Sequence, residues 1–293
     1  MYKALSPGAI GVQTPTIESS IAAAKLGGFA GVEISPSQIA DRIDRDGAES
    51  VKRLFDEAGI KPAGFGLPTE FRSDEGTWRA GIAELPRLAR AAAEIGCFRC
   101  MTWIMPCSNE LPLNQNRELH VERLRPVAAI LAIHGISFGL EFIGPKTLRE
   151  SQKYPFIHSM PDMLEMGSEI GPNVGLLLDC YHWYTAGHTV EEIRRLSAKQ
   201  VVYVHVNDAP EGVAVDQQLD GVRCLPGETG VIDIAGFLQA LKAIGYDGPV
   251  TPEPFKKELK ELPDDAARLR TVGDAMEKIW QTAKLSSFYQ DRR

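Results

Sequence analysis

Four consecutive apolar runs in the second half of the chain finish with side chains that can bind a metal or move a proton. Glu141 and Asp179 end two of these runs, and His205 and Glu253 stand at the ends of the next two. If the runs are parallel strands of a closed barrel, their carboxyl ends meet at one mouth, where catalytic groups of such barrels sit. We therefore expect the four groups at the same height, facing one another.

Three carboxylates side by side are costly to bury unless a cation compensates their charge. A divalent metal removes this cost, and three carboxylates with one imidazole suit a hard to borderline ion. We expect one ion, with Mn²⁺ preferred and Mg²⁺, Co²⁺ or Zn²⁺ as alternatives. Its open coordination positions could take two oxygens of a hydroxy-ketone. The alternative is that one or two of the four groups are strand-end charges facing solvent.

The elements that must position these groups follow a strand–helix alternation, which is typical of parallel βα units. Amphipathic stretches between the strands predict helices over 17–26, 81–95, 118–134 and 234–244. Eight such units close a (β/α)₈ TIM barrel. The predicted strands are 10–13, 31–34, 62–67, 99–104, 137–143, 174–179, 201–207 and 249–253.

The domain organisation follows from the same alternation, since no linker or internal repeat interrupts it. We expect a single TIM-barrel domain over residues 1–293, with the barrel at about 9–255 and a helical tail at about 256–293. A final helix is predicted over 264–283, packing across the barrel or against a partner subunit. A homodimer or tetramer is left open.

The chain resembles the sugar phosphate isomerase/epimerase superfamily, whose members have a xylose isomerase-like TIM barrel and include ketose 3-epimerases, inosose isomerases and inosose dehydratases. The resemblance covers roughly residues 9–255 and implies that fold, with a C-terminal helical extension. The motifs that carry it are Leu140-Glu141, Asp179-Cys-Tyr-His182, His205-Val-Asn-Asp208, Pro226-Gly-Glu-Thr-Gly230-Val-Ile-Asp233 and Glu253-Pro254-Phe255.

The resemblance also implies roles for individual residues. It places the metal ligands at Glu141, Asp179, His205 and Glu253, and the two acid/base carboxylates at Glu141 and Glu253. The metal would polarise a carbonyl and stabilise an enediolate, while one glutamate removes a proton and the other returns one. Epimerisation, isomerisation and dehydration all remain open, because the same ligands support each of them. His182 and Arg223 match positions that contact substrate.

Five further residues are candidates for the mouth of the barrel. Glu33 ends the second predicted strand and either reaches the pocket or hydrogen-bonds within the mouth. Trp103 and Trp183 either stack on a sugar or pack under a loop. Asn207 and Asp208 follow His205 directly, so one of them could orient its ring. The alternative for Asp208 is a turn before Ala-Pro.

Charge and cysteine usage exclude several classes of function. The net charge is −7 and no basic run is present, whereas duplex binding needs clustered Lys and Arg. We expect neither a nucleic-acid nor a membrane partner, since no stretch approaches ~20 apolar residues. The five cysteines are scattered and odd in number, which favours reduced thiols and a cytoplasmic location.

The preferred hypothesis is a metal-dependent isomerase or epimerase acting on a sugar, keto-sugar or cyclitol. A lyase or dehydratase on the same scaffold is the alternative, because long loops at 144–160 and 209–225 would reshape the pocket. An AP endonuclease-like hydrolase needs more metal ligands than six histidines readily supply, and a basic face. A sugar-binding barrel without catalysis is disfavoured by the presence of both glutamates.

Overall fold

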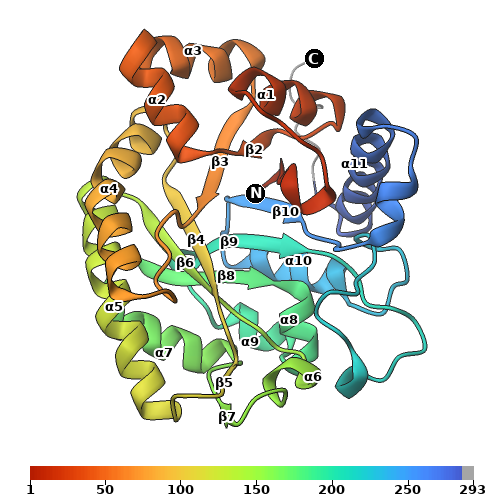
Figure 1. Ribbon diagram of the computed structural model, residues 1–293. Coiled ribbons are helices and arrows are strands. Elements are labelled where there is room, and N and C mark those ends of the chain that lie inside the picture. The colour runs from red at the N-terminus through yellow and green to blue at the C-terminus, as the bar shows by residue number, and fades with distance from the viewer. Residues whose placement is uncertain (286–293) are drawn as a thin grey trace.

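Eight parallel strands close into a barrel in the computed structural model, which describes residues 1–285 (Figure 1). Each strand pairs with its neighbours in parallel, and the last strand pairs with the first. This confirms the (β/α)₈ prediction. The strands are β1 (Tyr2–Leu5), β2 (Gly31–Glu33), β3 (Lys61–Gly66), β4 (Arg99–Ile104), β6 (Ser137–Phe142), β8 (Val174–Asp179), β9 (Val201–Val206) and β10 (Pro249–Pro252).

Helices surround the barrel, and a two-stranded antiparallel sheet of β5 (Cys107–Ser108) and β7 (Tyr154–Pro155) lies beside its mouth. Helix α11 packs against α1 and α10, so the predicted final helix belongs to the outer layer. The helices are α1 (Ile17–Leu26), α2 (Pro36–Asp46), α3 (Ala48–Ala58), α4 (Glu75–Glu94), α5 (Leu113–Ile133), α6 (Lys146–Arg149), α7 (Met160–Ile170), α8 (Cys180–Thr185), α9 (Val190–Arg194), α10 (Ile234–Ala243) and α11 (Asp265–Thr282).

The first strand is not where the sequence pattern placed it. The prediction of a strand at 10–13 is wrong, because Ile10 ends a short 3₁₀ turn and Gly11 has a φ of 72°. That left-handed conformation interrupts an extended run. Strand β1 instead begins at Tyr2, whose side chain, like that of Ala4, belongs to the cluster inside the barrel. The barrel therefore begins at the second residue of the chain.

The barrel interior is a packed core, as in other TIM barrels. Tyr203 of β9 is fully buried in a cluster that also contains Tyr2, Ala4, Ala63, Met101 and Leu177. A Cβ atom on Gly64 of β3 would lie 2.7 Å from the Tyr203 ring, so glycine makes room for it. Side chains therefore fill the barrel interior beneath the carboxyl-terminal mouth.

Within residues 1–285, none of the helices combines the length and the apolar character that a membrane span needs.

His120 of α5 is a buried histidine in the outer layer, and burial lowers its pKa from 6.5 to about 4. Between these values the unfolded chain binds a proton that the folded chain excludes, so stability should fall as the pH falls through this window. We expect wild-type protein to lose more unfolding free energy than His120→Leu between pH 7 and pH 4, by at most roughly 3 kcal/mol. Urea denaturation at each pH measures this, and equal losses would contradict it.

Candidate active site

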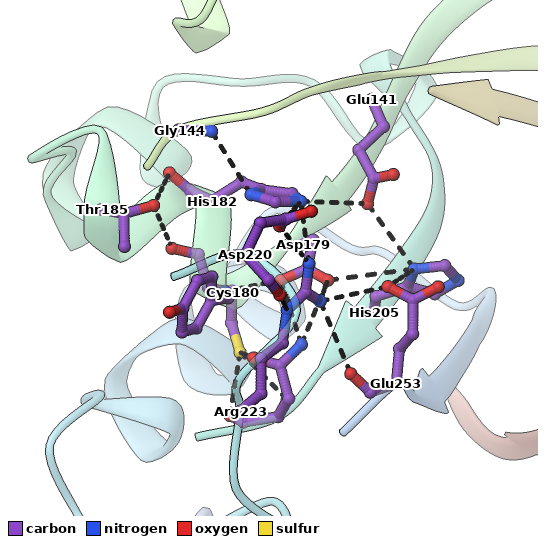
Figure 2. A network of polar contacts seen from close by, with 12 residues as sticks. Glu141, Gly144, Asp179, Cys180, His182, Thr185, His205, Asp220, Arg223 and Glu253 are labelled. Carbon is purple, nitrogen blue, oxygen red and sulfur yellow. Dashed lines mark hydrogen bonds and ion pairs between the residues drawn. The ribbon is translucent and has the colours of Figure 1, made fainter. Parts of the chain in front are cut away.

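The four predicted ligand residues converge at the carboxyl-terminal mouth of the barrel. Glu141 lies near the end of β6, Asp179 ends β8, His205 lies in β9 and Glu253 follows β10. Asp179 is the register partner of His205, and the backbone N–H of Glu253 continues the ladder by donating to Val206 at 3.0 Å. One candidate ligand atom from each of the four residues lies within 4.8 Å of the others (Figure 2).

The burial of these groups fits a cation. Nδ1 of His205 lies 3.6 Å from a Glu141 oxygen, 3.9 Å from an Asp179 oxygen and 3.4 Å from a Glu253 oxygen. Within residues 1–285, Glu141 Oε1 and both His205 ring nitrogens are buried without any hydrogen-bond partner. Buried polar atoms without partners are costly, and metal coordination is one way to satisfy them. The donor set therefore suits a divalent ion held through His205 Nδ1.

The same burial perturbs the pKa of each group. Burial raises the pKa of Glu141 to about 8. Burial would also raise the pKa of Glu253, but His205 and Arg223 outweigh this effect and lower it. For Asp179, Arg223 is the main cation that lowers the pKa against burial. The pKa of His205 is raised well above its usual value, because the glutamates outweigh its own burial. Without another cation, the carboxylates are balanced by protons and by Arg223.

Asp179 is oriented by three donors. It caps α8, and its Oδ1 accepts from the backbone N–H of Tyr181 at 2.5 Å. The Asn207 amide donates to both carboxylate oxygens, at 3.2 and 3.1 Å. Arg223 Nη1 donates to Oδ2 at 3.0 Å. Asn207 therefore supports the aspartate rather than His205, which corrects the sequence-based expectation.

Arg223 reaches the site from the long loop at 209–225, and only 3% of its surface is exposed. Its Nη1 donates to Glu253 Oε2 at 3.1 Å as well as to Asp179. Its Nε and Nη2 donate to the backbone oxygen and the carboxylate of Asp220, at 2.9 and 2.8 Å. Most of its N–H groups are thus engaged by the protein, so in this arrangement Arg223 links carboxylates instead of offering a free fork to a substrate.

Two aromatic rings hold the Arg223 guanidinium. Its central carbon lies 4.8 Å from the Tyr181 ring centroid and 4.6 Å from that of Phe255. Phe255 has a φ of 39°, a left-handed conformation that is strained for a bulky residue. Such strain persists where the surrounding structure imposes it. The turn that follows Glu253 thus brings an aromatic face over the guanidinium.

His182 lies on the Glu141 side of the mouth, with its Nε2 3.9 Å from Glu141 Oε1 (Figure 2). Its Nδ1 lies 3.3 Å from the backbone N–H of Gly144, and its Nε2 lies 3.2 Å from Arg223 Nη2, which can only donate. Burial lowers the pKa of His182 to about 4, so the ring is neutral near pH 7. A Cβ atom on Gly144 would lie 2.4 Å from the His182 carbonyl oxygen, so glycine is required there. His182 therefore lies between the Glu141 carboxylate and the Arg223 guanidinium.

Glu33 lies below the ligands, at the floor of the mouth. Its Oε1 accepts from the Tyr203 hydroxyl at 3.1 Å and lies 4.0 Å from His205 Nε2. The Tyr203 hydroxyl also lies 2.8 Å from that of Thr251. Burial raises the pKa of Glu33. Glu33 faces Nε2 of the imidazole, whereas the three carboxylates lie near Nδ1, and it makes no hydrogen bond to that ring.

The two tryptophans occupy different environments. Trp103 is 45% exposed and is the register partner of Glu141, so it stands at the wall of the mouth. The Arg72 guanidinium stacks on its ring at 4.0 Å. Trp183 instead is buried, packs against Phe237 at 5.4 Å and donates from Nε1 to Thr189. The expectation that Trp183 contacts substrate needs correction, because packing between α8 and α10 already accounts for its ring.

Asp208 organises the loop before α10, and within residues 1–285 its carboxylate has no hydrogen bond or ion pair with His205, so the expectation that it orients that ring is not supported. Its carboxylate accepts four backbone N–H groups, at 2.7 to 3.1 Å. The donors are Ala209, Thr229, Gly230 and Ile232. The motif at 226–233 is therefore a turn held by one buried carboxylate.

Removing this carboxylate should loosen the turn. We expect Asp208→Ala to lose roughly 2–4 kcal/mol of unfolding free energy, because several buried N–H groups lose their acceptor. Hydrogen exchange should accelerate at the amides of Gly230 and Ile232. Asp208→Asn keeps one acceptor oxygen, so its unfolding free energy and its exchange rates should lie between those of Asp208→Ala and wild type. Unchanged exchange at both amides in Asp208→Ala would contradict this assignment.

Three site residues were not found from the sequence. Asp220 contacts Arg223 and lies 3.7 Å from His182 Nε2, but nothing in its loop distinguishes it from a solvated aspartate. Tyr203 stands two residues before His205, so the period of a strand places it on the same face. Phe255 belongs to a recognised motif, but its contact with Arg223 depends on the backbone turn.

Comparison with known proteins finds relatives in both sequence and structure. An inosose isomerase from Halalkalibacterium halodurans is 23% identical over 79% of both chains. A 3-dehydroshikimate dehydratase from Pseudomonas aeruginosa is 27% identical over 86% of this chain but only 38% of its own length. A xylose isomerase domain protein from Alicyclobacillus acidocaldarius has a solved structure with a TM-score of 0.83 and 31% identity, covering 96% of this chain and 99% of that one. The model of the xylose isomerase-like TIM barrel family matches residues 21–276. The chain belongs to the xylose isomerase-like TIM barrel family.

Proposed function

We propose that the protein is a divalent-metal-dependent isomerase or epimerase that acts on a sugar, keto-sugar or cyclitol through an enediolate. One observation carries this proposal: Glu141, which is buried, and Glu253, which is partly buried, each place a carboxylate oxygen close to the same imidazole nitrogen, at 3.6 and 3.4 Å. Proton transfer at a carbon beside a carbonyl needs such a pair when the proton returns to another face or another carbon. The similarity to inosose isomerases supports the same class of reaction.

In this proposal the two glutamates divide the proton transfers. One carboxylate removes the proton beside the carbonyl, and the other carboxyl group delivers a proton to the opposite face or to the neighbouring carbon. Their different neighbours suit different tasks, since Glu253 is paired with Arg223 at 3.1 Å whereas Glu141 Oε1 has no hydrogen-bond partner within residues 1–285. Glu253 is therefore the group we assign to proton removal.

The other residues of the mouth hold the substrate and the charge balance. A divalent cation bound by Glu141, Asp179, His205 and Glu253 would polarise the carbonyl and stabilise the enediolate. His182 would contact a substrate oxygen, and Trp103 would cover one face of the ring. Arg223 would keep Asp179 and Glu253 ionised.

The test is solvent exchange. Protein stripped with EDTA and reloaded with Mn²⁺ is incubated in D₂O with a panel of ketoses and inososes, and the C–H signals beside the carbonyl are followed by NMR. We expect deuterium uptake in at least one compound, with Mn²⁺ and not with EDTA. Its absence across the panel in protein with one metal bound per chain would count against the proposal.

A lyase is the second candidate, favoured by the similarity to 3-dehydroshikimate dehydratases. Dehydration begins with the same proton removal, and the second carboxyl group then protonates a departing β-hydroxyl. The D₂O experiment separates the two reactions. Elimination loses water and gives an alkene signal, whereas epimerisation gives a sugar that differs from the substrate only in its configuration and its deuterium. Mn²⁺, Mg²⁺, Co²⁺ and Zn²⁺ should be compared in this assay, since the donor set accepts each of them.

A further inference from the structure

The imidazole of His205 has two ring nitrogens, and only one of them faces the other candidate ligands. Both nitrogens are buried without a hydrogen-bond partner within residues 1–285. The three carboxylates of the site approach the ring most closely at Nδ1, at 3.4 to 3.9 Å. A cation held among these carboxylates would therefore satisfy Nδ1 and leave Nε2, on the far side of the ring, without a partner.

Metal binding decides which hydrogen-bonding group Nε2 presents. A metal binds the lone pair of a neutral imidazole, so coordination at Nδ1 leaves the ring proton on Nε2. Nε2 of His205 would then be a buried N–H donor, and a buried donor that lacks an acceptor is costly. Histidines that bind metals usually donate this second N–H to a carboxylate, a backbone carbonyl or water, which fixes the orientation of the ring.

Glu33 is the acceptor that the fold places beside this nitrogen. Its closest approach to the imidazole is at Nε2, which lies 4.0 Å from Oε1. A hydrogen bond needs a separation of about 2.7–3.2 Å, so the two atoms must approach each other by about 1 Å. The terminal torsion of a glutamate side chain has a broad range, so a rotation of Glu33 can supply a movement of this size.

The Glu33 carboxylate is held in place from across the barrel interior. Glu33 ends β2 and His205 lies in β9, and the strands β1 and β10 separate these two in the closed sheet. The Tyr203 hydroxyl of β9 donates to Glu33 Oε1 at 3.1 Å. The same hydroxyl lies 2.8 Å from that of Thr251 in β10. These contacts keep the carboxylate on the side of the imidazole that the other candidate ligands do not face.

Tyr203 also contacts the imidazole itself. The two rings pack edge to face, with centroids 5.7 Å apart and planes at 89°. Tyr203 stands two residues before His205, so both side chains project from the same face of β9. One buried aromatic residue thus contacts both the histidine and the carboxylate beside it. The separation between Nε2 and Oε1 is therefore set by strands and not by a loop.

We propose that Glu33 is a positioning residue for the metal site: its carboxylate accepts the Nε2 proton of His205 when Nδ1 binds the divalent ion, and so fixes the ring in the orientation that binds the metal. This inference rests on the metal site of the proposed function, but it does not depend on the substrate or on the reaction. It gives a role to β2, which lies in the half of the barrel that supplies none of the four candidate ligands.

The first test is spectroscopic and uses Zn²⁺, a diamagnetic ion that the donor set accepts. Full-length protein labelled with ¹⁵N-histidine is compared by ¹H–¹⁵N NMR after EDTA treatment and after reloading with Zn²⁺. The chain has six histidines, and His205 is assigned by the loss of its signals in His205→Gln. We expect a zinc-dependent Nε2–H signal from His205 that exchanges slowly with solvent. In Glu33→Leu this exchange should be at least about 10-fold faster, because the N–H loses its acceptor.

The second test is the affinity for Mn²⁺, measured by titration calorimetry. Loss of the outer partner of a metal-bound histidine weakens binding by about 10–100-fold, and we expect Glu33→Leu to fall in this range. Glu33→Gln keeps an acceptor oxygen, so it should retain the slowly exchanging Nε2–H and bind Mn²⁺ more tightly than Glu33→Leu does. Glu70→Leu is the matched control and should bind as wild type does, because this carboxylate lies in the loop after β3 and accepts from Arg72.

Three outcomes would overturn the proposal. Unchanged Mn²⁺ affinity in Glu33→Leu would remove the role of Glu33 while leaving the metal site in place. A zinc-dependent N–H signal from Nδ1 of His205 would show that the metal binds Nε2 instead. Equal losses of affinity in Glu33→Leu and Glu33→Gln would assign the effect to charge and not to a hydrogen bond. Failure of wild-type protein to bind either ion would instead refute the metal site of the proposed function, so the two failures are distinguishable.

Discussion

Replacing either Glu141 or Glu253 by glutamine is expected to lower product formation by about 10²–10⁴-fold, because glutamine can neither take up nor deliver the transferred proton. The two variants should differ in solvent exchange. Glu253→Gln should lose deuterium uptake along with turnover. Glu141→Gln should retain deuterium uptake without inverting the carbon centre or moving the proton to the neighbouring carbon. The enediolate still forms, but it regains a proton only from the face that lost one.

Metal content and thermal melting must be measured on both variants, since each residue is also a candidate ligand. Glu258→Gln, an exposed substitution in the short 3₁₀ helix after Glu253, is the control and should be unaffected. Full turnover in a metal-loaded Glu141→Gln or Glu253→Gln protein would refute the assigned roles. Loss of uptake in Glu141→Gln alone would exchange the two roles.

Arg223→Leu is expected to lower the unfolding free energy of metal-free protein by about 3–5 kcal/mol, because it leaves buried carboxylates without their cation. Asp179 and Glu253 each lose an ion pair, at 3.0 and 3.1 Å. Saturating Mn²⁺ should recover part of this loss, since the ion supplies positive charge to the same two carboxylates. Urea denaturation of wild type and variant, with EDTA and with Mn²⁺, measures both effects.

Lys146→Leu provides a matched control, because Lys146 forms an ion pair of 2.9 Å with Asp216 at the protein surface. Such exposed pairs contribute about 0–1 kcal/mol, so little change is expected with or without metal. A stability loss in Arg223→Leu that is the same in EDTA and in Mn²⁺ would show that the guanidinium does not substitute for a bound cation. It would then act through its other contacts, the packing between Tyr181 and Phe255 and the hydrogen bonds to Asp220.

The convergence of the four candidate ligand residues could be predicted because it depends on regular structure. Parallel strands place their carboxyl ends together, so reading the last polar residue of each apolar run was sufficient for Glu141, Asp179 and Glu253. His182 followed from the resemblance to the family, through the motif Asp179-Cys-Tyr-His182. The barrel itself was recoverable for a similar reason, except for β1, where Gly11 interrupts a run that has the composition of a strand.

The contacts that depend on loops could not be predicted. Arg223 was expected to bind substrate, but its partners are set by the path of the loop at 209–225, which no periodicity describes. Trp183 and Asp208 were assigned to the mouth from their place in the chain alone, and packing and turn geometry place them elsewhere. The oligomeric state and the cellular location stay predictions.

Closure of the barrel has a consequence for how the protein is made. The ligands span the chain from Glu141 to Glu253, and the last of them follows the strand that pairs with the residues at the very start. A nascent chain cannot complete the site until that final strand has left the ribosome, and such distant pairings are slow to form. Metal affinity measured during refolding should therefore appear only at the last step, which makes the bound ion a reporter of barrel closure.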